Sequence, residues 1–171
     1  ISIIDSSSLN GYRSLRNDVI RPMIRDFEVN AVQVTDTLLF VDSAEGYLSS
    51  NLALLDFSVR REIFEQSDRP IITKVKDSPP TRYGKHADVH NSLIADGAVI
   101  DGTVRNSVIF RGVVIEEGAV VENSVIMQNS LIGRNAGLNY AILDKNVRIA
   151  EGRKLAGYIT HPFQLERNSR I

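Results

Sequence analysis

The chain has 171 residues, a formal net charge of −1 and no cysteine, with 20 Lys and Arg against 21 Asp and Glu. The lack of cysteine excludes disulfides and thiolate chemistry, and the balanced charge argues against a protein that coats nucleic acid or an anionic membrane. No apolar run reaches the ~18 residues of a membrane span, and the first residues lack the order of a signal peptide. We therefore expect a cytoplasmic protein of one sizeable or two small domains, with no nucleic-acid or membrane partner.

Residues 1–76 are expected to form a mixed α/β unit. Apolar residues recur at helical spacing near its start, and Pro22 must lie at a kink or in the first turn of that helix. Short strands are expected at residues 30–35, 38–41 and 71–75. The expected helical face consists of Leu15, Val19, Ile20, Met23, Ile24 and Phe27.

Two more helices are expected before a proline-rich linker. Residues 42–45, Asp-Ser-Ala-Glu, have the pattern of a capping box, and Ser58 is expected to cap the next helix. Ser78-Pro79-Pro80 predicts a rigid linker, which we place at residues 77–84. The face of the first of these helices consists of Tyr47, Leu48, Leu52 and Leu55.

Residues 85–171 carry an internal repeat that decides the architecture. The tetrapeptide Asn-Ser-(Leu/Val)-Ile starts at Asn91, Asn106 and Asn123, and a degenerate copy starts at Tyr140, so the starts lie 15, 17 and 17 residues apart. Apolar residues recur every six positions in three series: Ile109, Ile115 and Val121; Ile126, Ile132 and Leu138; Leu143, Ile149 and Leu155. Three positions after an apolar residue stands a turn residue: Gly97, Gly112, Gly118, Gly152, Asn129, Asn135 or Asn146.

This period predicts a parallel β-helix of hexapeptide repeats. The class of proteins that such repeats resemble is left-handed, so a left-handed coil is expected from that resemblance and not from the spacing. One inward apolar residue and one Gly or Asn per six residues indicate a short strand and a corner, because Gly and Asn tolerate positive φ. Three sides make one coil, and successive coils stack at about 4.8 Å. We expect four coils, with Ile109, Ile126 and Leu143 in one core column and Asn106 stacked on Asn123. An antiparallel sandwich is the alternative, but that fold does not explain why three successive apolar series all have the same six-residue spacing.

The ends of the coil differ from its middle. The repeat between Ile100 and Asn106 is two residues short, which predicts a tighter corner there. We expect the preceding half to close the first coil and a strand at 163–165 to close the last. An uncovered end or flat side would favour self-association.

The sequence contains few residues or motifs that are typical of catalytic sites. A hexapeptide acyltransferase needs a histidine base, and a β-helix carbonic anhydrase needs three histidines on a metal. His86 and His90 fall in the first coil and His161 lies past the last, so we expect surface roles, no catalytic residue and no metal site. The glycines of the coils occupy corners and form no phosphate-binding loop.

Basic residues gather at two places. Lys74, Lys76, Arg82 and Lys85 flank the linker, and Arg153 and Lys154 stand at the last coil. Such residues have the chemistry to bind a sugar phosphate or phosphate. Ordinary solvated charges are the alternative.

Ser50-Asn-Leu-Ala-Leu-Leu55, Ser78-Pro-Pro-Thr-Arg-Tyr83 and the Asn-Ser-(Leu/Val)-Ile coils follow one another in a familiar order and spacing. Over roughly residues 15–165 this order resembles the C-terminal portion of glucose-1-phosphate adenylyltransferase (ADP-glucose pyrophosphorylase). Residues 74–83 and 108–112 are most similar to the regulatory-type subunit of the bacterial two-subunit enzyme. The resemblance implies a role in glycogen synthesis, where the active partner converts ATP and glucose 1-phosphate to ADP-glucose and pyrophosphate. It also implies that residues 1–76 are the end of an α/β nucleotidyltransferase domain.

Two departures from the family pattern point to a subunit that does not catalyse. The Gly-rich G-x-G-T-R-L loop of the family is absent, so we interpret the chain as a C-terminal piece. Catalytic members carry an Mg²⁺-binding aspartate eleven residues before the asparagine that matches Asn51; that position here is Phe40, which has no oxygen donor. Asp42 is two positions out of place. We therefore expect no cofactor in this chain, and Mg²⁺ and ATP only in catalytic members.

The resemblance also implies an anionic effector site. The basic residue of the family's Pro-Pro-x-Lys/Arg motif, here Arg82, contributes to an effector site between the catalytic domain and the β-helix. The Arg153-Lys154 pair resembles a second basic site. The expected effector residues are therefore Arg82, Lys74, Lys76, Arg153 and Lys154.

Our interpretation is a fragment of a non-catalytic regulatory subunit, in a homo- or hetero-oligomer with a catalytic adenylyltransferase subunit. One alternative is a hexapeptide acyltransferase, which predicts a trimer, acetyl-CoA between the prisms and an essential His90. A second is a catalytic sugar-phosphate nucleotidyltransferase with relaxed motifs. A third is a pure assembly module without an effector.

Overall fold

A computed structural model describes residues 11, 13–25, 28, 30–66, 68, 70–73 and 76–171. The chain divides into two units, Ile1–Thr35 and Asp36–Ile171. In the first unit, the π-helical segment η1 (Leu15–Ile20) runs directly into α2 (Arg21–Met23), and Ser14 caps it by accepting a hydrogen bond from the Asn17 N–H. Pro22 lies in the first turn of α2, as expected. Phe27 of the expected face lies outside the described residues.

The prediction of three short strands in residues 1–76 is wrong for the described residues. Residues 30–35, 38–41 and 71–73 form no strand, and residues 74 and 75 lie outside the described residues. A strand is stable only beside a hydrogen-bonded neighbour, and within the described part of the chain no strand pairs with these segments. Their apolar side chains are accordingly exposed, Val32 to 85% and Ile72 to 92%.

The second unit begins with helices α3 (Ala44–Ala53) and α4 (Phe57–Phe64). Both predicted helices are present, but each cap lies one or two residues from its expected place. Ser43, and not Asp42, caps α3 through its hydroxyl, which accepts from the Gly46 N–H at 3.0 Å. Asp56, and not Ser58, caps α4, because its carboxylate accepts from both the N–H and the hydroxyl of Ser58.

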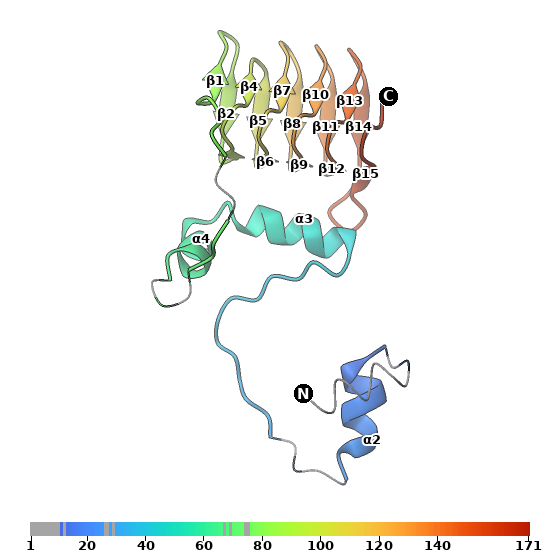
Figure 1. Cartoon of the computed structure of the whole chain (residues 1–171). Helices are drawn as coiled ribbons and strands as arrows, with labels where there is room; N and C mark the ends of the chain where they lie inside the picture. Colours follow the sequence, from blue (N-terminus) through green and yellow to red (C-terminus); the bar gives the residue numbers. More distant parts are fainter. Residues whose placement is uncertain are drawn as a thin grey trace. The chain divides into compact units, whose positions relative to one another are not determined.

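The predicted parallel β-helix is confirmed over residues 82–165. Three parallel sheets of five strands each form its walls (Figure 1). Sheet A consists of β1 (Arg82–Tyr83), β4 (Val99–Ile100), β7 (Val114–Ile115), β10 (Leu131–Ile132) and β13 (Arg148–Ile149). Sheet B consists of β2 (Asp88–His90), β5 (Thr103–Arg105), β8 (Val120–Glu122), β11 (Gly137–Asn139) and β14 (Lys154–Ala156). Sheet C consists of β3 (Leu93–Ile94), β6 (Val108–Ile109), β9 (Val125–Ile126), β12 (Ala141–Leu143) and β15 (Phe163–Leu165).

Each coil contributes one strand to each sheet, so there are five coils instead of the expected four. The difference arises at both ends. β1 lies inside the segment expected to be a linker. The strand expected at 163–165 is present as β15, and it pairs with β12 as the last strand of sheet C, which completes the fifth coil. The chain then begins to pair once more, since Arg170 bridges Arg148 of β13. The left-handed sense of the coil stays a prediction.

The core column forms as the six-residue period predicts. Ile109 pairs with Ile126, and Ile126 with Leu143, and all three side chains are buried. Buried serines close the corners between sheets B and C: the Ser107 hydroxyl donates to the Arg105 carbonyl at 2.7 Å and accepts from the Ser124 N–H at 3.1 Å. The buried Ser107 hydroxyl is therefore satisfied by hydrogen bonds inside the apolar interior.

The turn residues take the backbone conformation expected of them. All seven predicted Gly and Asn corners have φ between 55° and 75°. The asparagine stack is also present: Asn106 Nδ2 donates to Asn123 Oδ1 at 3.4 Å, and Asn123 Nδ2 to Asn139 Oδ1 at 2.9 Å. Tyr140 holds the positive-φ position of the fourth copy, so the neighbouring Asn139 supplies the amide there.

Gly102 explains the predicted tight corner. Only two residues separate β4 from β5, and a Cβ on Gly102 would lie 2.5 Å from the Ala119 carbonyl oxygen. We expect Gly102→Ala to lower the free energy of unfolding by about 1–3 kcal/mol, because the coils must move apart. Urea unfolding measures this. Gly152→Asn is the control: it has open space and the φ that Asn129 and Asn135 adopt, so a change above about 0.5 kcal/mol there would contradict the explanation.

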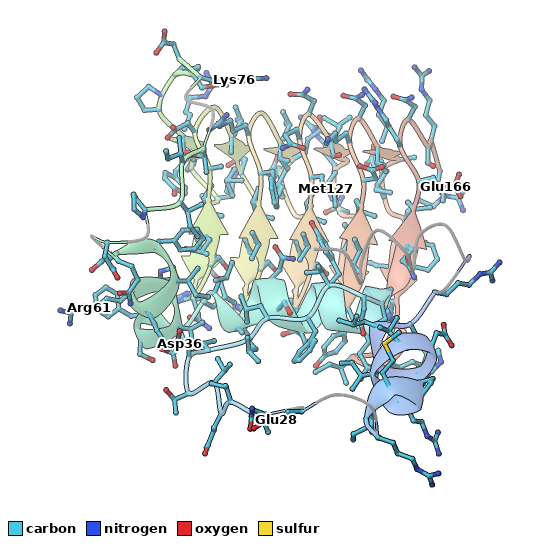
Figure 2. The ribbon with its side chains drawn as sticks, turned by 60° about the horizontal axis from the view of Figure 1, so that its bottom comes forward. Glu28, Asp36, Arg61, Lys76, Met127 and Glu166 are labelled. Carbon is cyan, nitrogen blue, oxygen red and sulfur yellow. The ribbon has the colours of Figure 1, made fainter. Side chains whose placement is uncertain are left out.

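Helix α3 covers the outer face of sheet C (Figures 1 and 2). Leu48 is fully buried against the outward side chains of three strands, Val108, Val125 and Ile142. The other predicted face residues of α3, Tyr47, Leu52 and Leu55, pack on the same cluster. In the described part of the chain, no helix is long and apolar enough to cross a membrane.

Candidate functional site

A basic pocket of about 470 Å³ lies at the corner between sheets C and A. Its cationic residues are Lys76, Arg111 and Lys145. Arg111 and Lys145 each precede a positive-φ corner residue, Gly112 and Asn146, and they lie two 17-residue coils apart, so the repeat places them in one column. Figure 2 shows Lys76 beside the first coil. The lining is completed by Ser78, Pro79, Gly97, Gly112, Gln128 and Asn129.

Among the described residues, no salt bridge neutralises the three cations of this pocket, Lys76, Arg111 and Lys145. The pocket lining contains no Asp or Glu. The neighbouring carboxylate, Asp144, accepts from the Lys145 backbone N–H at 2.7 Å and is not part of the lining. Arg111 is half-buried, whereas the two lysines are exposed. Three unneutralised positive charges around one cavity favour an anion, and the planar Arg111 guanidinium suits two oxygens of a phosphate.

Gln128 also lines this cavity, and its side chain carries an unpaired polar atom. Its side-chain Oε1 is buried and has no hydrogen-bond partner. A buried acceptor without a partner costs roughly 1–3 kcal/mol. This oxygen is closed to solvent, so a ligand in the pocket does not reach it in this conformation; the Ser78 hydroxyl is a further polar group of the lining.

Of the effector residues expected from the sequence, only Lys76 lines this pocket. Arg82 points outward from β1 on sheet A, and Arg153 and Lys154 lie exposed at the last coil. Lys74 lies outside the described residues. Sequence reasoning missed Arg111 and Lys145, although both stand one residue before a predicted Gly or Asn corner, which was the available signal.

Lys154 borders a second, smaller pocket on the outer face of sheet B. This hollow of about 290 Å³ contains the carboxylate of Glu122 as well as the Lys154 ammonium. Gly137 leaves room for the Lys154 stem, since a Cβ there would lie 2.7 Å from the lysine Cδ. One cation beside one carboxylate does not favour an anion, so the basic corner is the stronger candidate.

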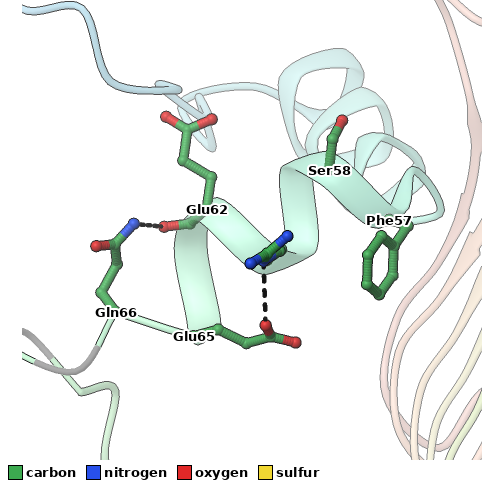
Figure 3. A pocket seen from close by; sticks show the side chains of 6 residues that line it. Phe57, Ser58, Glu62, Glu65 and Gln66 are labelled. Carbon is green, nitrogen blue, oxygen red and sulfur yellow. Dashed lines mark hydrogen bonds and ion pairs between the residues drawn. The ribbon is translucent and has the colours of Figure 1, made fainter.

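Helix α4 carries a third pocket, of about 450 Å³ (Figure 3). Its only cation, Arg61, is paired with Glu65 at 3.6 Å. Phe57, Ser58, Glu62 and Gln66 complete the lining. The net charge of this surface is negative, which excludes it as an anion site.

The histidines form separate surface contacts. His90 Nε2 lies 2.7 Å from an Asp88 carboxylate oxygen, and Arg105 contacts the other oxygen at 3.0 Å. The guanidinium of Arg105, followed by His90, lowers the pKa of the Asp88 carboxyl. His86 approaches Asp101 and Glu117 at 3.4 and 3.6 Å.

His161 lies apart from both, in the turn that it closes with Tyr158. Within the described ranges, no three His, Asp or Glu side chains are grouped as metal ligands. No described histidine lines one of the three pockets above.

Comparison with known proteins adds to this geometry. Residues 78–158 match the family model of the GlmU-like C-terminal hexapeptide. The chain is 41% identical over 127 residues to the glycogen biosynthesis protein GlgD of Bacillus subtilis. The aligned region covers 74% of this chain and 37% of that GlgD. It is 32% identical over 133 residues to a glucose-1-phosphate adenylyltransferase of Deinococcus deserti, covering 74% of this chain and 32% of the relative. The chain belongs to the glucose-1-phosphate adenylyltransferase family.

Within the adenylyltransferase family, this chain spans about a third of the length of the curated relatives it matches. GlgD of Geobacillus stearothermophilus gives the same picture, with 41% identity over 66% of this chain and 32% of the relative. The hexapeptide segment, the order of the motifs and these relatives agree with the resemblance read from the sequence.

Phe40 occupies the position where the resemblance places a metal-binding aspartate in catalytic adenylyltransferases. Its side chain is 63% exposed, and its carbonyl oxygen accepts a 2.6 Å hydrogen bond from the Ser50 hydroxyl. This bond holds the segment before α3 against the helix. Without a side-chain oxygen, however, the position has no donor for Mg²⁺.

Proposed function

We propose that this chain is the C-terminal part of a non-catalytic, regulatory-type subunit of glucose-1-phosphate adenylyltransferase in glycogen biosynthesis. The chemistry, conversion of ATP and glucose 1-phosphate to ADP-glucose and pyrophosphate, belongs to a catalytic partner subunit, which also holds the Mg²⁺. Phe40 in place of an acidic ligand supports the non-catalytic part of the proposal. The similarity to GlgD proteins and adenylyltransferases supports the place in glycogen biosynthesis.

The β-helix supplies a rigid scaffold for assembly in this proposal. Its coils are held to one another by backbone hydrogen-bond ladders on three sides, which gives a stacked, repetitive surface for contact with another subunit. We propose an oligomer with a catalytic adenylyltransferase subunit, in the cytoplasm.

The observation that carries the regulatory role is the basic pocket of Lys76, Arg111 and Lys145. Its charge favours an anion, such as a sugar phosphate or phosphate. The pocket joins the segment before the first coil to the corners of later coils, so a bound anion would fix the two together. We assign the effector site to these residues; Arg82 and the Arg153-Lys154 pair are tested beside them.

Calorimetric titration with fructose 1,6-bisphosphate and with phosphate tests the site. We expect the double variant Arg111→Ala/Lys145→Ala to weaken binding by roughly 100-fold, because it removes two charge-assisted contacts of about 1.5 kcal/mol each. Arg134→Ala, an exposed arginine on another corner, is the matched control and should leave the affinity unchanged. Equal affinity in the double variant and the wild type would reject the site. A loss in Arg82→Ala instead would move the site to the junction that the family resemblance indicates.

A further inference from the structure

The outer face of sheet A carries an aliphatic ladder flanked by arginines: Arg82 at one end, and at the other Arg148, which is bridged by Arg170. Each two-residue strand turns one side chain outward, and pairing places Arg82, Val99, Val114, Leu131 and Arg148 in direct register. The three aliphatic side chains are half-buried and the two arginines are exposed. Five strands at about 4.8 Å make this ladder ~19 Å long.

The outward residues of sheets B and C can be compared with this aliphatic ladder of sheet A. On sheet C the equivalent outward ladder is Leu93, Val108, Val125 and Ile142, and α3 covers it. On sheet B the equivalent ladder is Asp88, Thr103, Val120, Gly137 and Lys154, which is mostly polar. Sheet A therefore has the composition of the covered face, yet its ladder belongs to neither of the described hydrophobic clusters.

Size and charge restrict what can cover sheet A. A second copy related by a two-fold axis at Val114 would place Arg82 against Arg148 of that copy, and like charges repel. A strip of ~19 Å by ~10 Å also offers only about 200 Å², far below the ~800 Å² per partner of a standard interface. It matches one helix of about 13 residues.

We propose that the outer face of sheet A binds an amphipathic helix of a partner protein, with an aliphatic stripe and a carboxylate near each end. The stripe packs on Val99, Val114 and Leu131, in the way that α3 packs on sheet C. The carboxylates pair with Arg82 and Arg148, which form no salt bridge within the described part of the chain. This surface shares no residue with the basic pocket, so it goes beyond the proposed function.

The chain itself offers a probe with this chemistry. Residues 42–56 contain Leu48 and Leu52 on one helical face, Glu45 in the first turn and Asp56 after the end. A synthetic peptide of this segment, with Gly46→Ala to favour the helix, is titrated into the whole chain labelled at its Val and Leu methyl groups. We expect saturable NMR shifts at Val99, Val114 and Leu131.

Two variants of the chain decide the outcome. Val114→Glu should weaken peptide binding at least 10-fold, because it buries a charge under the helix, whereas Val120→Glu on sheet B should not. A second chain variant, Arg82→Glu/Arg148→Glu, should no longer bind the original acidic peptide. It should instead bind a peptide in which Glu45 and Asp56 are replaced by lysine. Methyl shifts confined to sheet C, equal binding by Val114→Glu and the wild type, or no binding to the wild type would overturn the proposal.

Discussion

Ile126→Ala is expected to lower the free energy of unfolding by about 2–5 kcal/mol, which is a large share of the stability of a small domain. Ile126 is fully buried at the middle of the core column, with Ile109 below and Leu143 above. Coils on both sides are fixed by their backbone ladders and cannot close on the space left behind, so the cavity persists.

Urea unfolding, followed by far-ultraviolet circular dichroism, gives the number. Val120→Ala is the matched control, because Val120 lies in the same coil but points outward and is half-exposed. We expect less than about 1 kcal/mol there. Similar losses in the two variants would mean that the six-residue period does not mark the inward side chains.

Leu48→Ala is expected to cost about 2–4 kcal/mol, since it removes the one fully buried side chain of α3. Its effect should be local as well as large. The amide protons of α3 should exchange with solvent faster, and those of β7 and β10 on sheet A should keep their protection, because the coils do not need the helix for their hydrogen bonds.

Ser49→Ala on the same helix is the control for Leu48→Ala. Ser49 is exposed and donates only to the Gly46 carbonyl, so we expect little change in stability and none in the exchange of the coils. Loss of protection throughout the β-helix in Leu48→Ala would show that α3 and the coils fold as one cooperative unit.

The β-helix could be predicted from the sequence because one inward residue in six must be apolar and one corner in six must tolerate positive φ. Ile109, Ile126 and Leu143 therefore reveal the core column, and Gly112 and Asn129 the corners, without any knowledge of packing. The first strand of the first coil, β1, was assigned to the linker because Arg82 and Tyr83 do not show the aliphatic pattern, although their backbone pairs with β4.

The first half of the chain was harder to predict, because its structure depends on pairing partners that the local sequence does not reveal. The apolar residues around Val32 and Phe40 have the alternation and β-branching of strands, but a strand exists only with a neighbour to pair with. Local sequence carries no information on that neighbour. The helices were predictable, since Tyr47, Leu48 and Leu52 repeat at helical spacing, but the choice between Asp42 and Ser43 as the cap depends on side-chain geometry.

The candidate site was only partly predictable. Lys76 was found because basic residues cluster beside the linker in the sequence. Arg111 and Lys145 are 34 residues apart and look unrelated until the coils are stacked, when the common period brings them to one pocket. Arg82 is close to Lys76 in sequence, but its strand turns it toward the face of sheet A, and it does not line the pocket.

The proposed function requires that this chain belong to a subunit that regulates and does not catalyse. The most direct measurement is pyrophosphate release from ATP and glucose 1-phosphate, by the full-length protein alone, by a catalytic adenylyltransferase homologue alone, and by the two mixed. We expect no release from the protein alone and a rate in the mixture that differs from that of the homologue. We also expect Arg111→Ala/Lys145→Ala to reduce any response of the mixture to fructose 1,6-bisphosphate. Release by the protein alone, or a mixture indistinguishable from the homologue, would contradict the claim.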